Sequence, residues 1–482
     1  MKRICRELSS GCNRPFILLG SLLLLATMPL VAAEPAPATG PLRVHPTNHR
    51  YFADASGKAV FLTGSHTWAN FQANSYENAP SPPPVDFDAY LAFLTKHNLN
   101  FFRLWTWENT FNPKVAQGTV YYGPPMPYER PGPELALDGK PKFDLNRFDQ
   151  TFFDRMRTLI TAARDRGIYA SVMLFQGFSI VGKGSIGGDA WKGHYYNPNN
   201  NINDVNSGGI NCHTLTDANI TALQEAYIRK VIDTVNDLDN VLYEIVNEDT
   251  GSPANTEWQY HMIRFIKDYE KTKPKQHPVG MTVQYPKGKD RDLEMSPADW
   301  ISPVAKVPTT DGGKVIINDT DHSAYWIELK AMGLAGQRAF VWKNVTRGYQ
   351  CLFMDPYLDP SKHVSRNNPT GSTPDPYWDV IRDAMGQSRR YAMRMDLAAT
   401  MPMGELASTN YCLANPGKEY LVFLPDGGEV TVDLSAAKGD LAVEWLRPVD
   451  GTVAQGGTVA GGAQRTLKSP FYGDAVLFLQ KR

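Results

Sequence analysis

Two groups of acidic residues in this sequence could act together on one covalent bond. Glu248 follows the apolar run Val241–Val246, and Asp319 and Asp321 follow the apolar run in Lys314–Asn318. Cleavage of a glycosidic bond needs two carboxyl groups that flank it. One protonates the leaving oxygen, and the other attacks the anomeric carbon or activates water. The sequence therefore has the residue types for this chemistry, provided that the fold brings both groups to one cleft.

The residues around these acids suggest separate roles. We interpret Glu248 as the proton donor and Asp321 as the nucleophile, because Asp321 lies just beyond the expected end of its strand. Asp319 is interpreted as a neighbour that holds the geometry, and the reverse assignment of the two aspartates stays open. Asn247 is placed to bind a sugar hydroxyl beside the reacting carbon. Arg103 could either hydrogen-bond the nucleophile and keep it ionised or form a salt bridge at the barrel rim.

Aromatic and polar side chains at the other expected strand ends are candidates for binding the substrate. Such rings can line sugar subsites, although some of them will pack in the core instead. These candidates are His66, Trp68, Trp105, Trp107, His322, Trp342 and Lys343. We expect neither a metal site nor a cofactor, and no convincing glycine-rich phosphate loop or serine nucleophile elbow is present.

Alternating strand and helix patterns predict an α/β fold, a parallel (β/α)8 TIM barrel over residues 41–400. A helix is expected to begin at Asp86, which is a suitable N-cap residue. The eighth strand is expected at Arg338–Trp342. In such a barrel the C-terminal strand ends carry the chemistry, and strands 4 and 7 lie on opposite sides of its mouth. A long polar segment at 177–216 follows strand 3, so we expect it to shape the substrate cleft.

After about residue 396 the pattern changes to short strands separated by tight turns. Asp426-Gly427-Gly428 and Asp450-Gly451 are examples of these turns. Their spacing predicts a small all-β sandwich domain over residues 405–482. We expect this domain to support the barrel rather than to contribute to the chemistry.

The first 33 residues have the pattern of a secretory signal peptide. Four basic residues precede or enter an apolar run at 16–30, and Val31-Ala32-Ala33 offers small residues for cleavage. The run is short for a membrane span, so we expect a secreted or periplasmic protein without stable membrane insertion.

Removal of residues 1–33 would take away four basic residues and one acid, which changes the net charge from −1 to −4. This charge gives no reason to expect nucleic acid as a partner. Cys212, Cys351 and Cys412 would remain, which permits one disulfide at most.

Several motifs resemble those of the apiosidase-like glycoside hydrolases, which belong to the clan of (β/α)8 enzymes with an acid/base at strand 4 and a nucleophile at strand 7. The similar segments are His45–Phe52, Arg103–Trp105, Phe143–Asn146, Tyr243–Glu248 and Phe353–Tyr357. The resemblance implies a retaining hydrolase of plant-type or other complex saccharides, with a small C-terminal domain of the kind labelled collagen-binding. In that family an Asp commonly serves at strand 4 and a Glu at strand 7, whereas this chain has Glu248 and Asp321. Apiose specificity is therefore not carried over.

Two functions of other classes stay open. A non-catalytic carbohydrate-binding or surface-adhesion protein could use the same cleft, and the shortened carboxylate at strand 7 is consistent with it. A metal-dependent barrel hydrolase could use His66, Asp319, Asp321 and His322. It lacks the closely spaced histidine pair that such enzymes have on strand 1.

Overall fold

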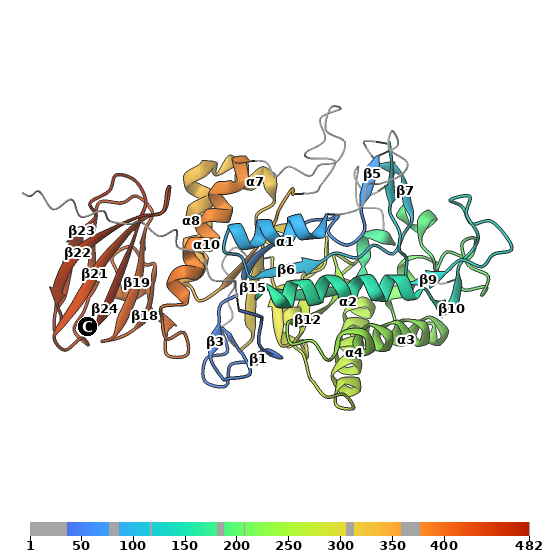
Figure 1. Ribbon diagram of the computed structural model, residues 1–482, viewed down its shortest axis with the longest axis horizontal. Coiled ribbons are helices and arrows are strands. Elements are labelled where there is room, and N and C mark those ends of the chain that lie inside the picture. The colour runs from blue at the N-terminus through green and yellow to red at the C-terminus, as the bar shows by residue number, and fades with distance from the viewer. Residues whose placement is uncertain are drawn as a thin grey trace, which may run out of the picture. The chain divides into compact units, whose positions relative to one another are not determined.

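The computed structural model describes residues 36–76, 86–115, 118–180, 188–206, 208–304, 313–357 and 376–481, so the expected signal peptide lies outside the described residues. Eight parallel strands close into a barrel, which confirms the predicted fold class (Figure 1). In chain order they are β4 (Thr63–His66), β6 (Phe101–Leu104), β11 (Tyr169–Gln176), β12 (Val241–Asn247), β13 (Val279–Thr282), β14 (Trp300–Ser302), β15 (Val315–Asp319) and β16 (Gln350–Met354).

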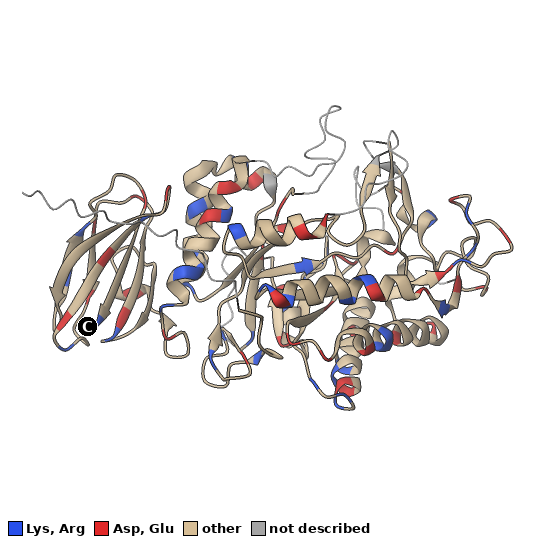
Figure 2. Ribbon diagram, in the orientation of Figure 1, with Lys and Arg blue, Asp and Glu red and all other residues tan. Residues whose placement is uncertain are grey.

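Helices follow the strands. The longer ones are α1 (Phe87–Lys96), α2 (Gln150–Asp165), α3 (Ala218–Val235), α4 (Pro253–Glu270), α8 (Gly333–Thr346) and α10 (Asp379–Ala392), and the shorter ones are α5 (Asp290–Met295), α6 (Thr320–Ser323) and α7 (Trp326–Ala331). The predicted N-cap is confirmed, because Asp86 accepts a hydrogen bond from the backbone N of Ala89 at 2.9 Å. Basic and acidic residues are interspersed along helices such as α2 (Figure 2).

The prediction of a strand at Arg338–Trp342 is wrong, because these residues lie in helix α8. A short apolar run is compatible with both a buried strand and a buried helix. The buried positions Gln337, Val341 and Val345 recur every four residues, as on one face of a helix. The eighth strand is β16, which comes four residues after α8 ends.

The barrel interior changes from apolar to polar along the strands. Near the N-terminal strand ends it is filled by an apolar cluster that includes Leu62, Phe101, Leu242, Trp300, Val315, Ile317 and Leu352. Side chains alternate between the two faces of a strand, so residues two or four positions further on face the same interior. These are His66, Arg103, Glu244 and Asp319, all of them buried. The apolar layer thus supports a layer of ionisable groups at the C-terminal end.

Smaller sheets surround the barrel ends. Before strand 1, β1 (Arg43–Val44), β2 (Phe52–Ala53) and β3 (Ala59–Val60) form one antiparallel sheet. A second antiparallel sheet has the order β5-β8-β7 and joins β5 (Asn74–Tyr76), which precedes β6, to β8 (Gly118–Tyr122) and β7 (Phe111–Val115), which follow it. A two-stranded pair follows, β9 (Tyr128–Glu129) with β10 (Asp144–Phe148).

The predicted C-terminal β-sandwich is confirmed. Its six-stranded sheet has the order β17-β18-β19-β24-β21-β22, and a two-stranded sheet pairs β20 with β23. The strands are β17 (Met401–Pro402), β18 (Cys412–Asn415), β19 (Glu419–Leu424), β20 (Glu429–Asp433), β21 (Asp440–Arg447), β22 (Thr452–Ala460), β23 (Gln464–Lys468) and β24 (Ala475–Lys481). β22 and β23 are strands that the sequence does not predict, because neither of them has a buried residue and both are largely exposed.

The central strands β19 and β24 of the six-stranded sheet are buried on both faces. Along β19, Tyr420 and Val422 pack inside the sandwich, whereas Leu421 and Phe423 join the core of the barrel. Phe478 of β24 also joins the barrel core, where its ring lies 5.5 Å from that of Tyr391 on α10. The two domains therefore share one apolar interface.

Two further findings concern the helices and the cysteines. Among the helices in the described part of the chain, none is both long and apolar enough to cross a membrane. Cys212, Cys351 and Cys412 are buried free thiols.

Phe478→Ala should destabilise the protein, because it leaves a cavity in the interface between the barrel and the six-stranded sheet. We expect the free energy of unfolding to fall by about 3–5 kcal/mol. The control is Val453→Ala on β22, where the side chain is half exposed. Urea denaturation would measure both, and equal midpoints for the two variants would contradict the shared interface.

Candidate active site

Three carboxyl groups meet at the C-terminal end of the barrel. Glu248 directly follows β12, Asp319 is the last residue of β15, and Asp321 lies in the short helix α6. The negative charges of Glu248 and Asp319 both act on Asp321. The structure therefore brings together the acids of strands 4 and 7 that the sequence singled out.

Arg103 lies at the centre of this group. Its Nε donates a hydrogen bond to Oε2 of Glu244 at 2.6 Å, and its Nη2 donates to Oε1 of Glu244 and to Oδ1 of Asn247, the latter at 2.8 Å. Its Nη1 lies 3.5 Å from Oδ2 of both Asp319 and Asp321. The buried guanidinium thus bonds most closely with Glu244 and also faces both aspartates.

Sequence reasoning missed Glu244. It lies inside the apolar run of strand 4, where it was counted as part of the strand. The signal was its place four residues before Glu248 on a strand, which puts it on the interior face of the barrel. An acid at such a position needs a buried cation, and Arg103 on strand 2 is that cation.

Asp319 is held as an anion. Its Oδ1 lies 3.0 Å from Nε2 of His66 and accepts a hydrogen bond from the backbone N of Asp321 at 2.9 Å. Burial opposes ionisation, but His66 and Arg103 outweigh it, so the pKa of Asp319 is lowered. Asp319 therefore caps the turn that carries Asp321.

Asp321 has the opposite electrostatic character. Burial and the charges of Glu248 and Asp319 outweigh the attraction of Arg103 and raise the pKa of Asp321 well above its ordinary value. Among the described residues, its Oδ2 has no hydrogen-bond partner. Because two nearby negative charges repel each other, the state in which Glu248 and Asp321 are both ionised is disfavoured. The pair can therefore hold one proton.

Two other expected residues lie beside these acids. Asn247 donates from Nδ2 to Oε1 of Gln176 at 3.1 Å, which fixes the orientation of its amide. His322 has Nδ1 3.0 Å from Oγ of Ser302, and its Nε2 is 3.8 Å from Oδ2 of Asp321. Both side chains thus belong to the site geometrically.

Aromatic residues form one wall beside the acids. The His66 ring stacks on Trp105 at 5.3 Å, and the Trp105 ring lies 6.4 Å from Trp68 and 6.0 Å from Trp107. Nε1 of Trp107 donates to the carbonyl of Trp68 at 2.7 Å. Nε1 of Trp105 is buried and has no hydrogen-bond partner among the described residues, so it is a donor that a ligand could use.

Trp342 and Lys343 do not join this site, since both lie on α8 rather than at a strand end. Trp342 is buried in the barrel core with its ring 6.1 Å from Tyr391. Nζ of Lys343 lies 5.0 Å from the ring of Tyr411 at the start of the C-terminal domain. Their proposed contact with substrate depended on the wrong assignment of strand 8.

Within the described residues, no group of three or more His, Cys, Asp or Glu side chains is arranged to hold a metal ion.

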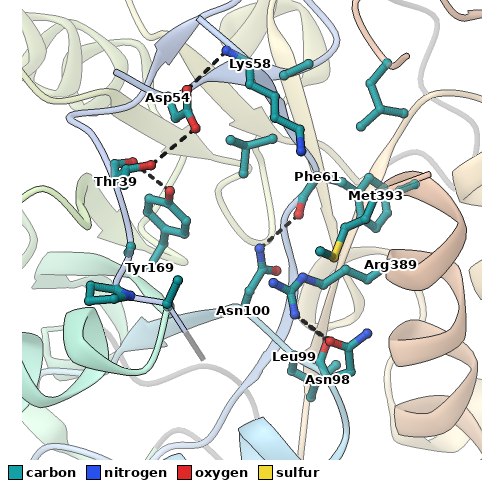
Figure 3. A pocket seen from close by; sticks show the side chains of 18 of the residues that line it. Thr39, Asp54, Lys58, Phe61, Asn98, Leu99, Asn100, Tyr169, Arg389 and Met393 are labelled. Atoms are coloured by element: carbon teal, nitrogen blue, oxygen red, sulfur yellow. Dashed lines mark hydrogen bonds between the residues drawn. The ribbon is translucent and has the colours of Figure 1, made fainter. Parts of the chain in front are cut away.

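A separate cavity of about 390 Å³ lies at the opposite end of the barrel. Phe61, Asn100 and Tyr169 line it, next to the N-terminal ends of strands 1, 2 and 3 (Figure 3). In barrel enzymes this end serves stability, whereas the other end carries the chemistry. The cavity is therefore distinct from the site of the three carboxyl groups.

Comparisons with known proteins agree with this architecture. Residues 118–290 match a family described as a domain of unknown function (DUF6298). A comparison with curated protein sequences gives no match.

Solved structures give a broader likeness. One is a glycoside hydrolase with 14% identity and a TM-score of 0.56, where 92% of this chain and 97% of that chain are covered. A family 5 glycoside hydrolase from Bacteroides vulgatus ATCC 8482 has 12% identity and a TM-score of 0.56, with coverage of 92% and 94%. A third structure, from the same bacterium, has 14% identity and a TM-score of 0.59, with coverage of 92% and 82%. The chain has the fold of glycoside hydrolases.

Arg103→Met should strongly destabilise the protein, because Glu244 would remain buried without its cation. Breaking a buried ion pair typically costs about 3–5 kcal/mol of unfolding free energy. Adding Glu244→Leu to that variant should restore part of the loss, which chemical denaturation of both single variants and the double variant would measure. Strictly additive losses would mean that the pair is not coupled.

Asp319 and Asp321 should affect stability with opposite dependence on pH. The lowered pKa of Asp319 stabilises the fold above the unfolded value of about 3.9, and this contribution is lost as the pH falls through the folded pKa. The raised pKa of Asp321 stabilises the fold below about 3.9, and this contribution is lost as the pH rises through the folded pKa.

Denaturation at several pH values would test this difference. Between about pH 4 and pH 7, the free energy of unfolding of Asp321→Asn should rise relative to that of the wild type as the pH increases. That of Asp319→Asn should stay below the wild-type value throughout this range. The same trend for both variants would contradict the assigned charge states.

Proposed function

We propose that the protein is an exported glycoside hydrolase that acts on plant-type or other complex polysaccharides or oligosaccharides. Glu248 is the proton donor and Asp321 the nucleophile of a retaining, double-displacement reaction. The observation that carries this proposal is that Glu248, directly after β12, and the buried Asp321, directly after β15, both lie at the C-terminal end of the barrel, where the charge of Glu248 acts on Asp321. Two carboxyl groups that hold one proton between them supply one acid and one nucleophile.

The reactive form is the one in which the single proton of the pair resides on Glu248 and Asp321 is ionised. Because the pKa of Asp321 is raised, this form is in equilibrium with the form in which Asp321 holds the proton. A carboxylate oxygen of Asp321 attacks the anomeric carbon as the glycosidic C–O bond breaks, and Glu248 gives its proton to the leaving oxygen. Glu248 then removes a proton from water, which attacks the glycosyl-enzyme ester and releases Asp321. Nη1 of Arg103, 3.5 Å from Oδ2 of Asp321, stabilises the ionised form at the start and the end of this cycle.

Asp319 serves as the positioning residue for Asp321. Its Oδ1 is occupied by His66 and by the backbone N of Asp321, and its Oδ2 faces Arg103. Asp321, in contrast, has an oxygen without a hydrogen bond among the described residues. This difference favours Asp321 over Asp319 as the group that attacks.

Polar and aromatic groups around the acids would bind the sugar. Asn247 precedes the donor and is oriented by Gln176. The buried Nε1 of Trp105 would donate a hydrogen bond to a sugar hydroxyl. The rings of Trp68 and Trp107 would extend the aromatic wall against which the sugar packs. His322 would complete the site on the side of strand 7.

The resemblance to the apiosidase-like hydrolases supports the same class of reaction. The departure at the two acids leaves the sugar and the linkage open. Export is proposed from residues 1–33, whose charge and apolar pattern is that of a signal peptide.

The mature chain can be tested on a panel of aryl glycosides and plant oligosaccharides. Glu248→Ala should lose about 10²–10⁴-fold in kcat on substrates with poor leaving groups. It should retain more activity on aryl glycosides with good leaving groups, which need little protonation. If the protein bound oligosaccharides but hydrolysed none of the substrates, the proposed enzyme activity would be wrong and the protein would be a non-catalytic carbohydrate-binding protein.

Azide distinguishes the two carboxyl groups and the two aspartates. Azide should accelerate Glu248→Ala and give a glycosyl azide of retained configuration, because it attacks the glycosyl-enzyme ester. Asp321→Ala should be inactive on both substrate types, and azide rescue there should give the inverted product. If Asp319→Ala gave the inverted azide and Asp321→Ala kept near-normal rates, the roles of the two aspartates would be exchanged.

A further inference from the structure

His213 is a fully buried ionisable side chain that has no part in the reaction described above. It ends η4 (Ile210–His213), in the segment that follows strand 3. Its Nδ1 lies 2.5 Å from Oδ2 of Asp249, the residue directly after Glu248. Its Nε2 lies 3.8 Å from Oε2 of the buried Glu108. Each ring nitrogen therefore faces a carboxylate.

The His213 ring is held by packing as well as by charge. It stacks on Trp258 of α4 with ring centroids 4.4 Å apart and an angle of 12° between the planes. Phe175 of β11 packs against it edge-on at 5.6 Å. The position of this ring is therefore set by α4, by β11 and by the contact with Asp249 after β12.

Asp249 is held from several sides in turn. Its Oδ2 accepts a hydrogen bond from Nδ2 of Asn255 at 2.7 Å in addition to its contact with His213. Its Oδ1 accepts from the backbone N of Thr250, and its own backbone N donates to Oε1 of Gln284. The residue after the proton donor is thus fixed by η4, α4 and the chain that follows β13.

The backbone at Glu248 needs such support. Its φ of +42° lies in the left-handed region, which is uncommon for a residue other than glycine. Residues held in this way persist only where the surrounding structure fixes them. Gly177 approaches so closely that an added Cβ would lie 2.6 Å from the carbonyl oxygen of Glu248. The segment that carries His213 therefore begins against the turn that carries the donor.

The charges around His213 favour its protonated form. The titratable groups that face it are Cys212 on its own element, Glu108 after strand 2 and Asp249 after strand 4. Burial opposes protonation, but the pKa of His213 is raised well above its usual range, and the negative charge that favours this is that of Asp249, because burial raises the pKa of the Cys212 thiol and keeps it neutral. Glu108 also contacts His194 at 3.5 Å, and the two histidines lower the pKa of this carboxyl in spite of its burial.

We propose that His213 is a positioning residue for Glu248, which acts through Asp249 to hold the left-handed turn and to set the charge beside the proton donor. The role depends on the proposed function only in that Glu248 is the donor. His213 itself does not touch the reacting atoms.

The test compares His213→Gln with a matched control, His194→Gln. His194 is equally buried, belongs to the same segment and also contacts Glu108, but its Nδ1 accepts a hydrogen bond from the backbone N of Tyr196 and does not contact Asp249. The carboxyl carbons of glutamate are labelled with ¹³C in the full mature chain, and the Glu248 signal is assigned with Glu248→Gln. Its titration is then followed by NMR.

In His213→Gln, we expect the Glu248 titration midpoint to move to higher pH by about one unit, because a positive charge is removed while Glu108 and Asp249 remain. In His194→Gln, it should stay within experimental error of the wild type. If His213→Gln does not fold, Asp249→Asn removes the same contact from the other side and should also move the midpoint. An unchanged midpoint in the folded variant of this pair would overturn the proposal.

Turnover provides a second readout. His213→Gln should lower kcat by about 10-fold or more on substrates with poor leaving groups and by less on activated aryl glycosides, whereas His194→Gln should affect both types equally. An equal loss on both types in His213→Gln would contradict the role through Glu248. Failure of the wild type to hydrolyse any substrate would refute the proposed function, but the NMR titration would still decide whether His213 controls Glu248.

Discussion

The placement of one guanidinium inside the barrel determines the rest of the site. Arg103 is buried, and a buried cation is tolerated only where anions and hydrogen-bond acceptors surround it. Glu244 supplies the closest carboxylate, and Asp319 and Asp321 lie further out. Three acids around one cation leave an excess of negative charge, which His66 offsets at Asp319. The remaining imbalance falls on Asp321, and this is why its carboxyl resists ionisation while that of Asp319 does not.

Parts of this arrangement could be predicted from the sequence, because they depend on neighbours along the chain. The apolar runs before Glu248 and Asp319 identify two strand ends, and the barrel brings such ends to one face. Asp86 is similarly a local signal for the start of a helix. Trp342 was misplaced because the short, mostly apolar run Arg338–Trp342 fits a helix and a strand equally well. Only the burial of every fourth residue in the folded chain settles that it belongs to a helix.

Other parts could not be predicted, because they join residues that are close only in space. Glu108, His213 and Asp249 come from the chain after strand 2, the segment before α3 and the end of strand 4. No spacing rule connects them. Glu244 lies between these cases, since its strand and its face follow from the pattern but its partner Arg103 comes from a different strand.

The C-terminal sheet has a consequence for the order in which this protein is made. Its last strand, β24, lies between β19 and β21, in the interior of the sheet rather than at an edge. A ribosome delivers residues 475–481 after the other strands of this sheet, so β19 and β21 stay unjoined until β24 has been made. Until then the side chains that pack against Phe478, including Tyr391 of α10, lack this packing contact. The barrel therefore emerges with an exposed apolar side, which is covered only after β24 has been translated and has paired with β19 and β21.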